Sequence, residues 1–423
     1  VRRLRAGAAC AIVAMTAASL VGCGDDQGDG STSGQVTLRY SWWGNAERAD
    51  LMQQAISLFE AKYPNIKITP SFQEYEAYWQ KMATETAGGN APDVLQMDFS
   101  YLREYADRGV LYDLRKQSAD LRLDDLVEGL QGAGEVNGGR FGVPIGGNTW
   151  GYMYNPALFA KAGVPEPRLG WTWTDYRTAI AKITADNGGK IFGAGNYVGS
   201  YYNLEVQLRQ EGKLLFTEGG KLGFDRARLA RFLTEGRQLA ESKTVLPIEK
   251  GVQIKPKHAL ALDLIAGDLG WDNFMARYAA ATKAQLKLGP VPSDNPKLLG
   301  QYLKPAMLLS ASKRGRHPAA AAKLISFMIN DPEVGKIFGA NRGMPATNAQ
   351  RAAVRFEGPL ATVAAYEDGI KDQLTKAPPA PPKGAGTLEQ AFIRITEELQ
   401  YGRITVDQAV TQFFADAADT LGS

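Results

Sequence analysis

The chain has 423 residues, with 48 Lys and Arg against 45 Asp and Glu, two histidines and two cysteines. This near-neutral balance, without a basic stripe, argues against a nucleic-acid-binding protein. Two histidines and two cysteines also argue against a typical zinc site. About 390 residues follow the first 35, which is ample for two domains.

The N-terminus has the pattern of a secretory signal peptide. Arg2, Arg3 and Arg5 form a positive segment, and a run rich in Ala, Ser and Thr follows from Ala6 to Val21. This run is short and weakly apolar compared with a membrane span of ~20 strongly apolar residues. Its end, Leu-Val-Gly-Cys at 20–23, resembles a bacterial lipobox, in which the cysteine is acylated. An ordinary cysteine after a plain signal peptide is the alternative.

We therefore expect a lipoprotein signal peptide at residues 1–22 and a flexible tether at 23–35. Removal of residues 1–22 takes away three arginines, no acidic residue and Cys10, which leaves 45 basic and 45 acidic residues and no internal disulfide. Acyl chains such as palmitate on Cys23 would anchor the protein, because each buried CH₂ contributes about 0.8 kcal/mol. The small, polar residues of 24–34 favour a flexible spacer. The predicted location is extracytoplasmic, at the outer face of the cell membrane.

Strand and helix patterns alternate in the next hundred residues. Val36–Trp43 and Ile66–Phe72 are rich in β-branched and aromatic residues and predict strands, as does Val94–Met97 after Pro92. Apolar residues at helical spacing predict helices at 49–63 and 75–87. A βαβαβ order predicts a parallel sheet with crossover helices.

Residues 141–154 have a different pattern, with a Gly146-Gly147 pair and alternating aromatic residues. They predict an extended segment that leaves one domain for another. A second α/β region follows. The further elements predicted are helices at 173–183 (opened by Thr172 or Thr174), 204–210, 229–239 and 319–329, extended segments at 286–291 and 306–310, a polyproline-like linker at 377–382, and two helices around Gly402 in 388–421.

Several motifs together resemble the extracellular solute-binding proteins of family 1, the sugar receptors of bacterial ABC importers. The resemblance covers nearly the whole mature chain. The family's proline-containing turn before Thr172-Trp173 lacks the proline in this chain. The motifs are Ser-Trp-Trp-Gly at 41–44, Gly-Asn-Ala-Pro-Asp-Val at 89–94, Phe-Gly-Val-Pro at 141–144, Tyr-Asn-Pro-Ala-Leu-Phe-Ala-Lys-Ala-Gly at 154–163, the helix and turn at 319–332, and Arg-Gly-Met-Pro-Ala at 342–346.

The resemblance implies an α/β, two-lobed, periplasmic-binding-protein-like (type II) fold with hinge crossings between the lobes. The implied N-terminal lobe is 36–146 plus 303–345, and the implied C-terminal lobe is 151–300 plus 350–423. The implied function is that of a monomeric substrate-binding component without a cofactor. Such a component captures a carbohydrate by hinge closure and delivers it to membrane permease subunits. The many aromatic residues of the chain favour an oligosaccharide over a monosaccharide.

Sugar recognition needs flat aromatic rings against the C–H faces and polar groups against the hydroxyls. Trp43 ends the first strand, with Asn45 and Glu47 in the loop after it, and we expect these three at the cleft. Trp42 points the other way and is expected in the core. Asp98 follows the third strand and either meets the ligand or caps a helix at 101–107.

Further candidates come from the hinge and from the second region. Asn148 and Trp150 lie in the presumed hinge segment. Tyr197, like Tyr201, adjoins a glycine-rich stretch and either lines the cleft or caps a loop. Trp271 occurs in a Gly-Trp-Asp-Asn run where the resemblance places a stacking aromatic ring; a core position is the alternative.

The remaining candidates are Asp272, Gln301 and Arg342. Asp272 follows Trp271 directly. The resemblance places Gln301 and Arg342 where related proteins contact sugar, although Arg342 would also suit a structural salt bridge across the hinge.

Two other functions remain open. A secreted glycoside-processing enzyme would need two carboxylates about 5–10 Å apart, which 45 acidic residues do not exclude. The sequence has no GxSxG or GxxxxGK[ST] motif, however, and we expect neither catalytic residues nor a metal site. A lipoprotein that presents its ligand to a membrane sensor would share the fold and differ only in its partner.

Overall fold

The computed structural model describes residues 34–255 and 257–422. The predicted signal peptide, Cys23 and nearly all of the predicted tether lie outside this range. In the described residues, no helix is long and apolar enough to cross a membrane. No cluster of three or more His, Cys, Asp or Glu side chains suited to a metal ion occurs there either.

The N-terminal lobe is built on a six-stranded sheet with the order β12-β6-β11-β3-β1-β2. Strands β1 (Val36–Trp43), β2 (Ile66–Gln73) and β3 (Val94–Met97) are parallel. The crossovers between them contain α1 (Ala46–Lys62) and α2 (Tyr75–Ala87). The predicted βαβαβ unit is therefore confirmed.

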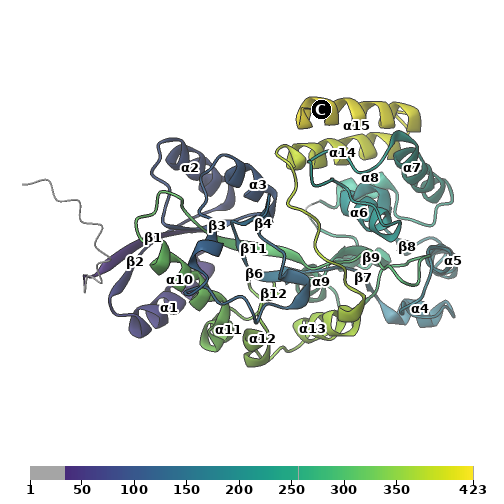
Figure 1. Cartoon of the computed structure of the whole chain (residues 1–423). Coiled ribbons are helices and arrows are strands. Elements are labelled where there is room, and N and C mark those ends of the chain that lie inside the picture. The colour runs from purple at the N-terminus through teal and green to yellow at the C-terminus, as the bar shows by residue number, and fades with distance from the viewer. Residues whose placement is uncertain (1–33, 256, 423) are drawn as a thin grey trace, which may run out of the picture. The chain divides into compact units, whose positions relative to one another are not determined.

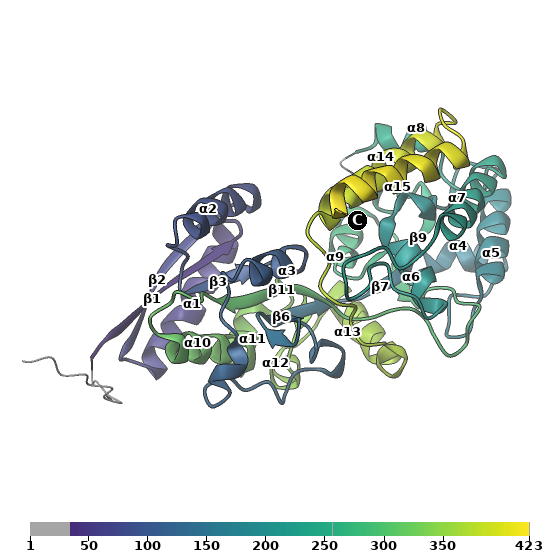
Figure 2. The same ribbon diagram turned by 45° about the horizontal axis from the view of Figure 1, so that its top comes forward.

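The other half of this sheet comes from distant parts of the chain. Strand β11 (Lys304–Ala311) pairs antiparallel with both β3 and β6 (Val143–Asn148), and β12 (Met344–Pro345) pairs antiparallel with β6. Figures 1 and 2 show α2 and α3 (Phe99–Asp107) on one face of the sheet and α10 (Pro318–Asn330) and α11 (Pro332–Phe338) on the other. The sheet is mixed rather than all parallel.

The C-terminal lobe has a four-stranded sheet with the order β10-β7-β9-β8. These strands are β7 (Trp150–Tyr154), β8 (Phe192–Ala194), β9 (Ile265–Trp271) and β10 (Lys287–Gly289). The longer helices of this lobe are α5 (Trp173–Asp186), α6 (Tyr201–Gln210), α7 (Arg226–Glu241), α14 (Ala385–Gln400) and α15 (Val406–Leu421). The predicted pair of helices around Gly402 is confirmed.

The capping box of α5 is made by Thr172, which settles the choice between Thr172 and Thr174.

Shorter elements complete the described chain. These elements are β4 (Glu135–Val136), β5 (Gly139–Arg140), α4 (Pro156–Lys161), α8 (Ile248–Gln253), α9 (Phe274–Ala281), α12 (Asn348–Ala353) and α13 (Pro359–Ile370).

One extended segment belongs to both sheets. Strand β6 ends at Asn148 and β7 begins at Trp150, so Thr149 is the residue at which the chain crosses. The predicted extended segment at 141–154 contains β6 and β7, which belong to the six-stranded and the four-stranded sheet. Lys304, the first residue of β11, pairs with Asn148 next to this crossing.

Each sheet has its own apolar core. In the N-terminal core, Phe59 of α1 is fully buried and packs against Phe327 of α10 with ring centroids 5.4 Å apart. In the C-terminal core, Phe392 of α14 packs edge-on against Phe413 of α15. Full burial of such a side chain contributes roughly 1.5–3 kcal/mol. Among the described residues there is thus one large core in each lobe, and a smaller third cluster around Met153.

Candidate functional site

A cavity of about 240 Å³ lies between residues of the two lobes, and we call it the first cavity. From the N-terminal lobe it receives Asp98 and the first residues of α3. From the C-terminal lobe it receives one face of α6 and the start of α14, and β11 contributes its first residue. Its lining residues with polar side chains are Asp98, Ser100, Tyr201, Tyr202, Glu205, Tyr302, Lys304 and Glu389.

Three aromatic rings form a platform beside this cavity. Trp150, Tyr202 and Trp271 make edge-to-face or tilted contacts, with Trp271 centred 4.9 Å from each of the other two rings. The indole N–H of Trp150 donates to Asn203 Oδ1 over 2.7 Å, which fixes the ring. Tyr202 and Trp271 remain partly exposed. A partly exposed, rigid aromatic surface can stack against an apolar face of a ligand.

A second group of rings lies in the N-terminal lobe around Asp98. Trp79 stacks on Tyr101 with centroids 4.1 Å apart and contacts Tyr75 and Trp43 at 6.2 and 5.9 Å. Tyr75 is 41% exposed. Burial, followed by the negative charge of Asp98, raises the pKa of both Tyr75 and Tyr101. Asp98 therefore joins the N-terminal rings to the first cavity.

Charged groups surround the platform. The ammonium of Lys304 lies 5.0 Å from the ring centre of Tyr202 and 5.1 Å from that of Trp271. Burial opposes the charge of Lys304, but Tyr202, Asp98 and Glu389 outweigh it and raise the pKa of the lysine. Burial also raises the pKa of Glu389, which Lys304 partly offsets. Cation–π contacts of this kind contribute about 0.5–2 kcal/mol.

The carboxylate of Glu205 is more deeply placed. Glu205 accepts a hydrogen bond from the Tyr302 hydroxyl over 2.8 Å, and burial raises the pKa of its carboxyl while Arg209 opposes the rise. The guanidinium of Arg209 lies 4.7 Å from the centre of the Tyr302 ring. These contacts fix the positions of Glu205 and Tyr302, which line the first cavity.

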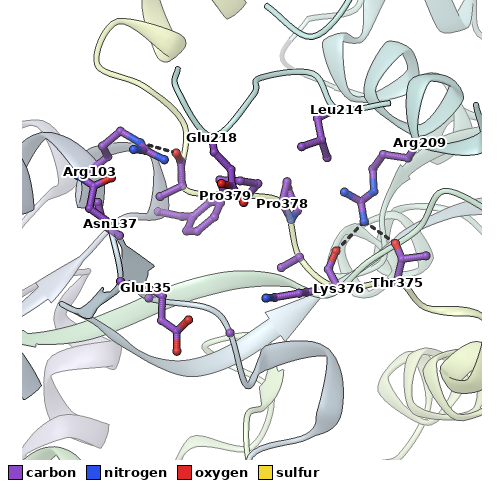
Figure 3. Close-up of a pocket in the computed structure, with 17 residues that line it drawn as sticks. Arg103, Glu135, Asn137, Arg209, Leu214, Glu218, Thr375, Lys376, Pro378 and Pro379 are labelled. Atoms are coloured by element: carbon purple, nitrogen blue, oxygen red, sulfur yellow. Dashed lines mark hydrogen bonds between the residues drawn. The ribbon is translucent and has the colours of Figure 1, made fainter. Parts of the chain in front are cut away.

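The linker at 375–382 lines a second cavity of about 480 Å³ (Figure 3), and its Pro378 and Pro379 line the first cavity as well. One arginine from each lobe holds this linker. Arg103 of α3 donates to the carbonyl of Ala380 over 2.8 Å, and Arg209 of α6 donates to the Thr375 hydroxyl and, over 2.7 Å, to the Lys376 carbonyl. The polyproline-like linker predicted at 377–382 is thus held from both lobes and lines both cavities.

The structure brings three of the predicted site residues to the platform and the first cavity: Asp98, Trp150 and Trp271. Asp98 also caps α3 by accepting from the backbone N–H of Ser100 over 2.9 Å, which confirms the helix-cap alternative; its contact with a ligand stays a prediction. Asn148 is partly buried beside Lys304 at the crossing.

Other predicted residues have structural surroundings. Tyr197 lies in the C-terminal core, where its hydroxyl donates to Glu235 over 2.6 Å, and it does not line the first cavity; its neighbour Tyr201 does. Trp43 is 7% exposed within the N-terminal rings. Asn45 caps α1 by accepting from a backbone N–H.

The remaining predicted residues also lie outside the first cavity. Glu47 is exposed in the first turn of α1. Gln301 is fully buried and donates to the carbonyl of Trp150 and to the Tyr366 hydroxyl. Arg342 is 2% exposed and donates to Gln96 Oε1 over 2.8 Å. Among the described residues, no carboxylate pairs with it.

Sequence reasoning missed Tyr202, Glu205, Lys304 and Glu389. Tyr202 and Glu205 lie on α6, where every residue is at least partly buried. The available signal was the four-residue spacing from Tyr201 to Glu205, which places an aromatic and an acidic side chain on one face of this helix. Lys304 and Glu389 are far apart in the sequence and carry no local motif. Only the fold brings them together.

Asp272 belongs to a buried pair of carboxyl groups next to the crossing. The backbone N–H of Thr149 donates to Asp272 Oδ2 over 2.8 Å. Asp272 lies close enough to Glu367 of α13 for their charges to interact, and Glu367 pairs with Arg351 at 2.9 Å. Burial, and then the charge of Glu367, raises the pKa of Asp272 well above its ordinary value. Burial raises the pKa of Glu367 too, against the effect of Arg351. Both shifts favour a bound proton in this pair.

This proton makes a testable contribution to stability. Above pH 3.8, the ordinary pKa of Asp272, the unfolded chain releases the proton while the folded chain keeps it. Stability is therefore lost as the pH rises toward the raised pKa, by up to about 1.4 kcal/mol per pH unit. Asp272→Asn removes this titration and keeps an oxygen for Thr149. Urea denaturation at a series of pH values should give a flatter profile for the variant, and identical profiles would contradict the bound proton.

Comparisons with known proteins agree with this architecture. The model of the family described as bacterial extracellular solute-binding protein matches residues 44–334, which is more than half of the chain. A family 1 extracellular solute-binding protein from Alicyclobacillus acidocaldarius is 28% identical, has a TM-score of 0.78, and covers 93% of this chain and 100% of its own. A periplasmic oligogalacturonide-binding protein from Yersinia enterocolitica has a TM-score of 0.80 at 22% identity, covering 92% of this chain and 99% of its own.

Similarity to relatives by sequence alone is more limited. An uncharacterized lipoprotein of Streptomyces antibioticus is 24% identical over 249 residues, which are 55% of this chain and 50% of that protein. A putative binding protein of Brucella abortus is 24% identical over 38% of this chain and 39% of its own length, so the match spans about two fifths of that relative. The family match, the two sheets joined at Thr149 and the cavity between them lead to one conclusion: the chain is a member of the bacterial extracellular solute-binding proteins, with their two-lobed type II fold.

Proposed function

We propose that this protein is the substrate-binding component of an ABC importer and that its ligand is an oligosaccharide. The observation that carries the proposal is the first cavity, which Tyr202 of the platform lines together with Asp98 and Glu389. Trp150 and Trp271 pack against the Tyr202 ring. Rings of this kind suit the apolar faces of pyranose units, and carboxylates suit their hydroxyls. The N-terminal rings extend the aromatic surface, which favours several sugar units over one.

Names of related proteins support a saccharide ligand. One neighbour by structure is a Listeria monocytogenes ABC substrate-binding protein in complex with cycloalternan, and one relative by sequence is the multiple sugar-binding protein of Streptococcus mutans. The transfer of a sugar to permease subunits is part of the proposal. Ligand that touches both lobes would stabilise a closed arrangement, which the permease would then recognise.

A thermal-melt panel of neutral, acidic and amino oligosaccharides tests this function. A ligand present at about 100 times its Kd adds about 2.7 kcal/mol to the free energy of unfolding, which gives a clear rise in Tm. The same mixtures are assayed for released reducing ends. A shift without turnover supports a receptor, and turnover would support the glycoside-processing alternative. If peptides or polyamines shift the melt and no saccharide does, the ligand class is wrong.

We also propose that acyl chains on Cys23 anchor a monomeric protein to the outer face of the membrane. Cys23→Ser should move the protein from the membrane fraction to the soluble fraction, because the acylated thiol is lost. Metabolic labelling with a fatty-acid analogue checks the modification directly. Labelling and membrane association that persist in the variant would contradict the anchor. Pull-down of membrane partners separates a permease from a sensor as the recipient.

A further inference from the structure

The charges at the first cavity do not balance. Asp98, Glu205 and Glu389 line it against a single lysine, Lys304. None of the three carboxylates forms an ion pair with a lysine or arginine within residues 34–255 and 257–422. The positive charge of Arg209 opposes the rise in the pKa of Glu205. The negative charges of Asp98 and Glu389 raise the pKa of Lys304. Three carboxyl groups therefore share two cations, Lys304 and Arg209, at this cavity.

The same cavity already accommodates one ammonium group. Lys304 Nζ lies over the faces of Tyr202 and Trp271 and is 3.3 Å from the hydroxyl oxygen of Tyr202, to which it donates. The Tyr202 hydroxyl in turn donates to Glu389 over 3.4 Å. Rings and carboxylates are therefore arranged as in sites that attract cations.

An unpartnered hydroxyl points to a ligand as well. Tyr201 lines the first cavity and is 4% exposed. Its hydroxyl has no hydrogen-bond partner among the described residues. A buried hydroxyl in this state costs free energy unless another polar group meets it. An amine or hydroxyl of a sugar would supply that group.

The second cavity differs in charge. Arg103, Arg209 and Lys376 line it, against Glu135 and Glu218. The excess of carboxyl groups over cations is therefore found at the first cavity, to which α14 contributes Glu389, and not at the second. A preference for cationic groups is therefore confined to the part of a ligand that lies on the aromatic platform.

We propose that the ligand is a saccharide with a protonated amine, whose ammonium group is received between Asp98 and Glu389 beside the aromatic platform. This inference rests on the proposed saccharide-binding function and names the class of saccharide. A uronic acid at the same position would bring its carboxylate toward two carboxylates of the protein, which disfavours binding.

Glucosamine oligomers and their fully N-acetylated counterparts of equal length test the proposal, with calorimetry at mildly acidic pH. N-acetylation removes the positive charge and keeps the sugar backbone. The amine form should bind about tenfold more tightly, equivalent to about 1.4 kcal/mol, and added salt should narrow the difference. Equal or tighter binding of the N-acetylated form, or tighter binding of oligogalacturonate, would overturn the proposal. If no saccharide of any charge binds, the proposed function itself fails.

Two variants assign the effect to these carboxylates. Glu389→Gln should bring the affinity ratio of the amine and N-acetylated forms close to one. Asp98→Asn should also lower the ratio, and asparagine still caps α3 well. Glu398→Gln on the same helix, outside both cavities, is the matched control and should keep the ratio. A ratio unchanged in both Glu389→Gln and Asp98→Asn would place the amine elsewhere and refute the proposed recognition.

Discussion

Replacing Trp271 with alanine is expected to weaken saccharide binding at least about tenfold, or about 1.4 kcal/mol. Its ring contacts both Trp150 and Tyr202 and supports the ammonium of Lys304, so its loss removes the central part of the platform. Calorimetry with the saccharide that gives the largest melt shift measures the effect. The Tm without ligand should change little, because the Trp271 ring is partly exposed.

The matched control for this substitution is Tyr401→Ala. Tyr401 is also a partly exposed aromatic residue, contacts Arg403 and lines neither cavity. It should leave the Kd unchanged. An unaltered Kd in Trp271→Ala would place its ring outside the binding surface, and an equal loss in both variants would indicate a general effect on the fold.

Replacing Arg351 with alanine is expected to lower the free energy of unfolding by about 3–5 kcal/mol. Glu367, its partner at 2.9 Å, is only 2% exposed, so the substitution leaves two buried carboxyls with no cation. Arg351 also donates from Nε to the Pro345 carbonyl over 2.7 Å. Chemical denaturation measures the loss, which should be larger at neutral than at acidic pH because protonation removes the charge of Glu367.

Two further variants separate charge burial from a general effect. Arg394→Ala breaks an exposed pair with Asp416, and such pairs contribute only about 0–1 kcal/mol. The double variant Arg351→Ala, Glu367→Gln should recover part of the lost stability, since glutamine carries no charge to leave unpaired. Equal losses for Arg351 and Arg394 would show that the buried pair has no special role.

Most secondary structure could be predicted from local pattern, because the residues that determine it are neighbours in sequence. The alternation of β1, α1, β2, α2 and β3 depends on β-branched strands and helical spacing. The insertion of β11 between β3 and β6 could not be predicted, since nothing in residues 304–311 selects these partners. Short helices were missed where the signals are weak: at α12, the hydroxyl of Thr347 bonds the Ile329 carbonyl rather than capping the helix.

Residues of the candidate site could be predicted only where the local sequence determines their position. Asp98 follows β3 directly and Trp271 is the last residue of β9, so both lie at an end of a strand. For Tyr197 and Tyr201 the sequence left the same two alternatives open. In the structure Tyr197 lies in the core, where its hydroxyl donates to Glu235, whereas Tyr201 lines the first cavity. Glu389 lies at the first cavity because the linker before α14 brings the chain back to this cavity.

Lys304 makes two different contacts, one through its side chain and one through its backbone. Its ammonium faces the aromatic rings, and its backbone forms the rung that pairs with Asn148, immediately before the chain passes from one sheet to the other. A ligand bound beside this ammonium would therefore lie next to the residues at which the chain crosses between the two sheets.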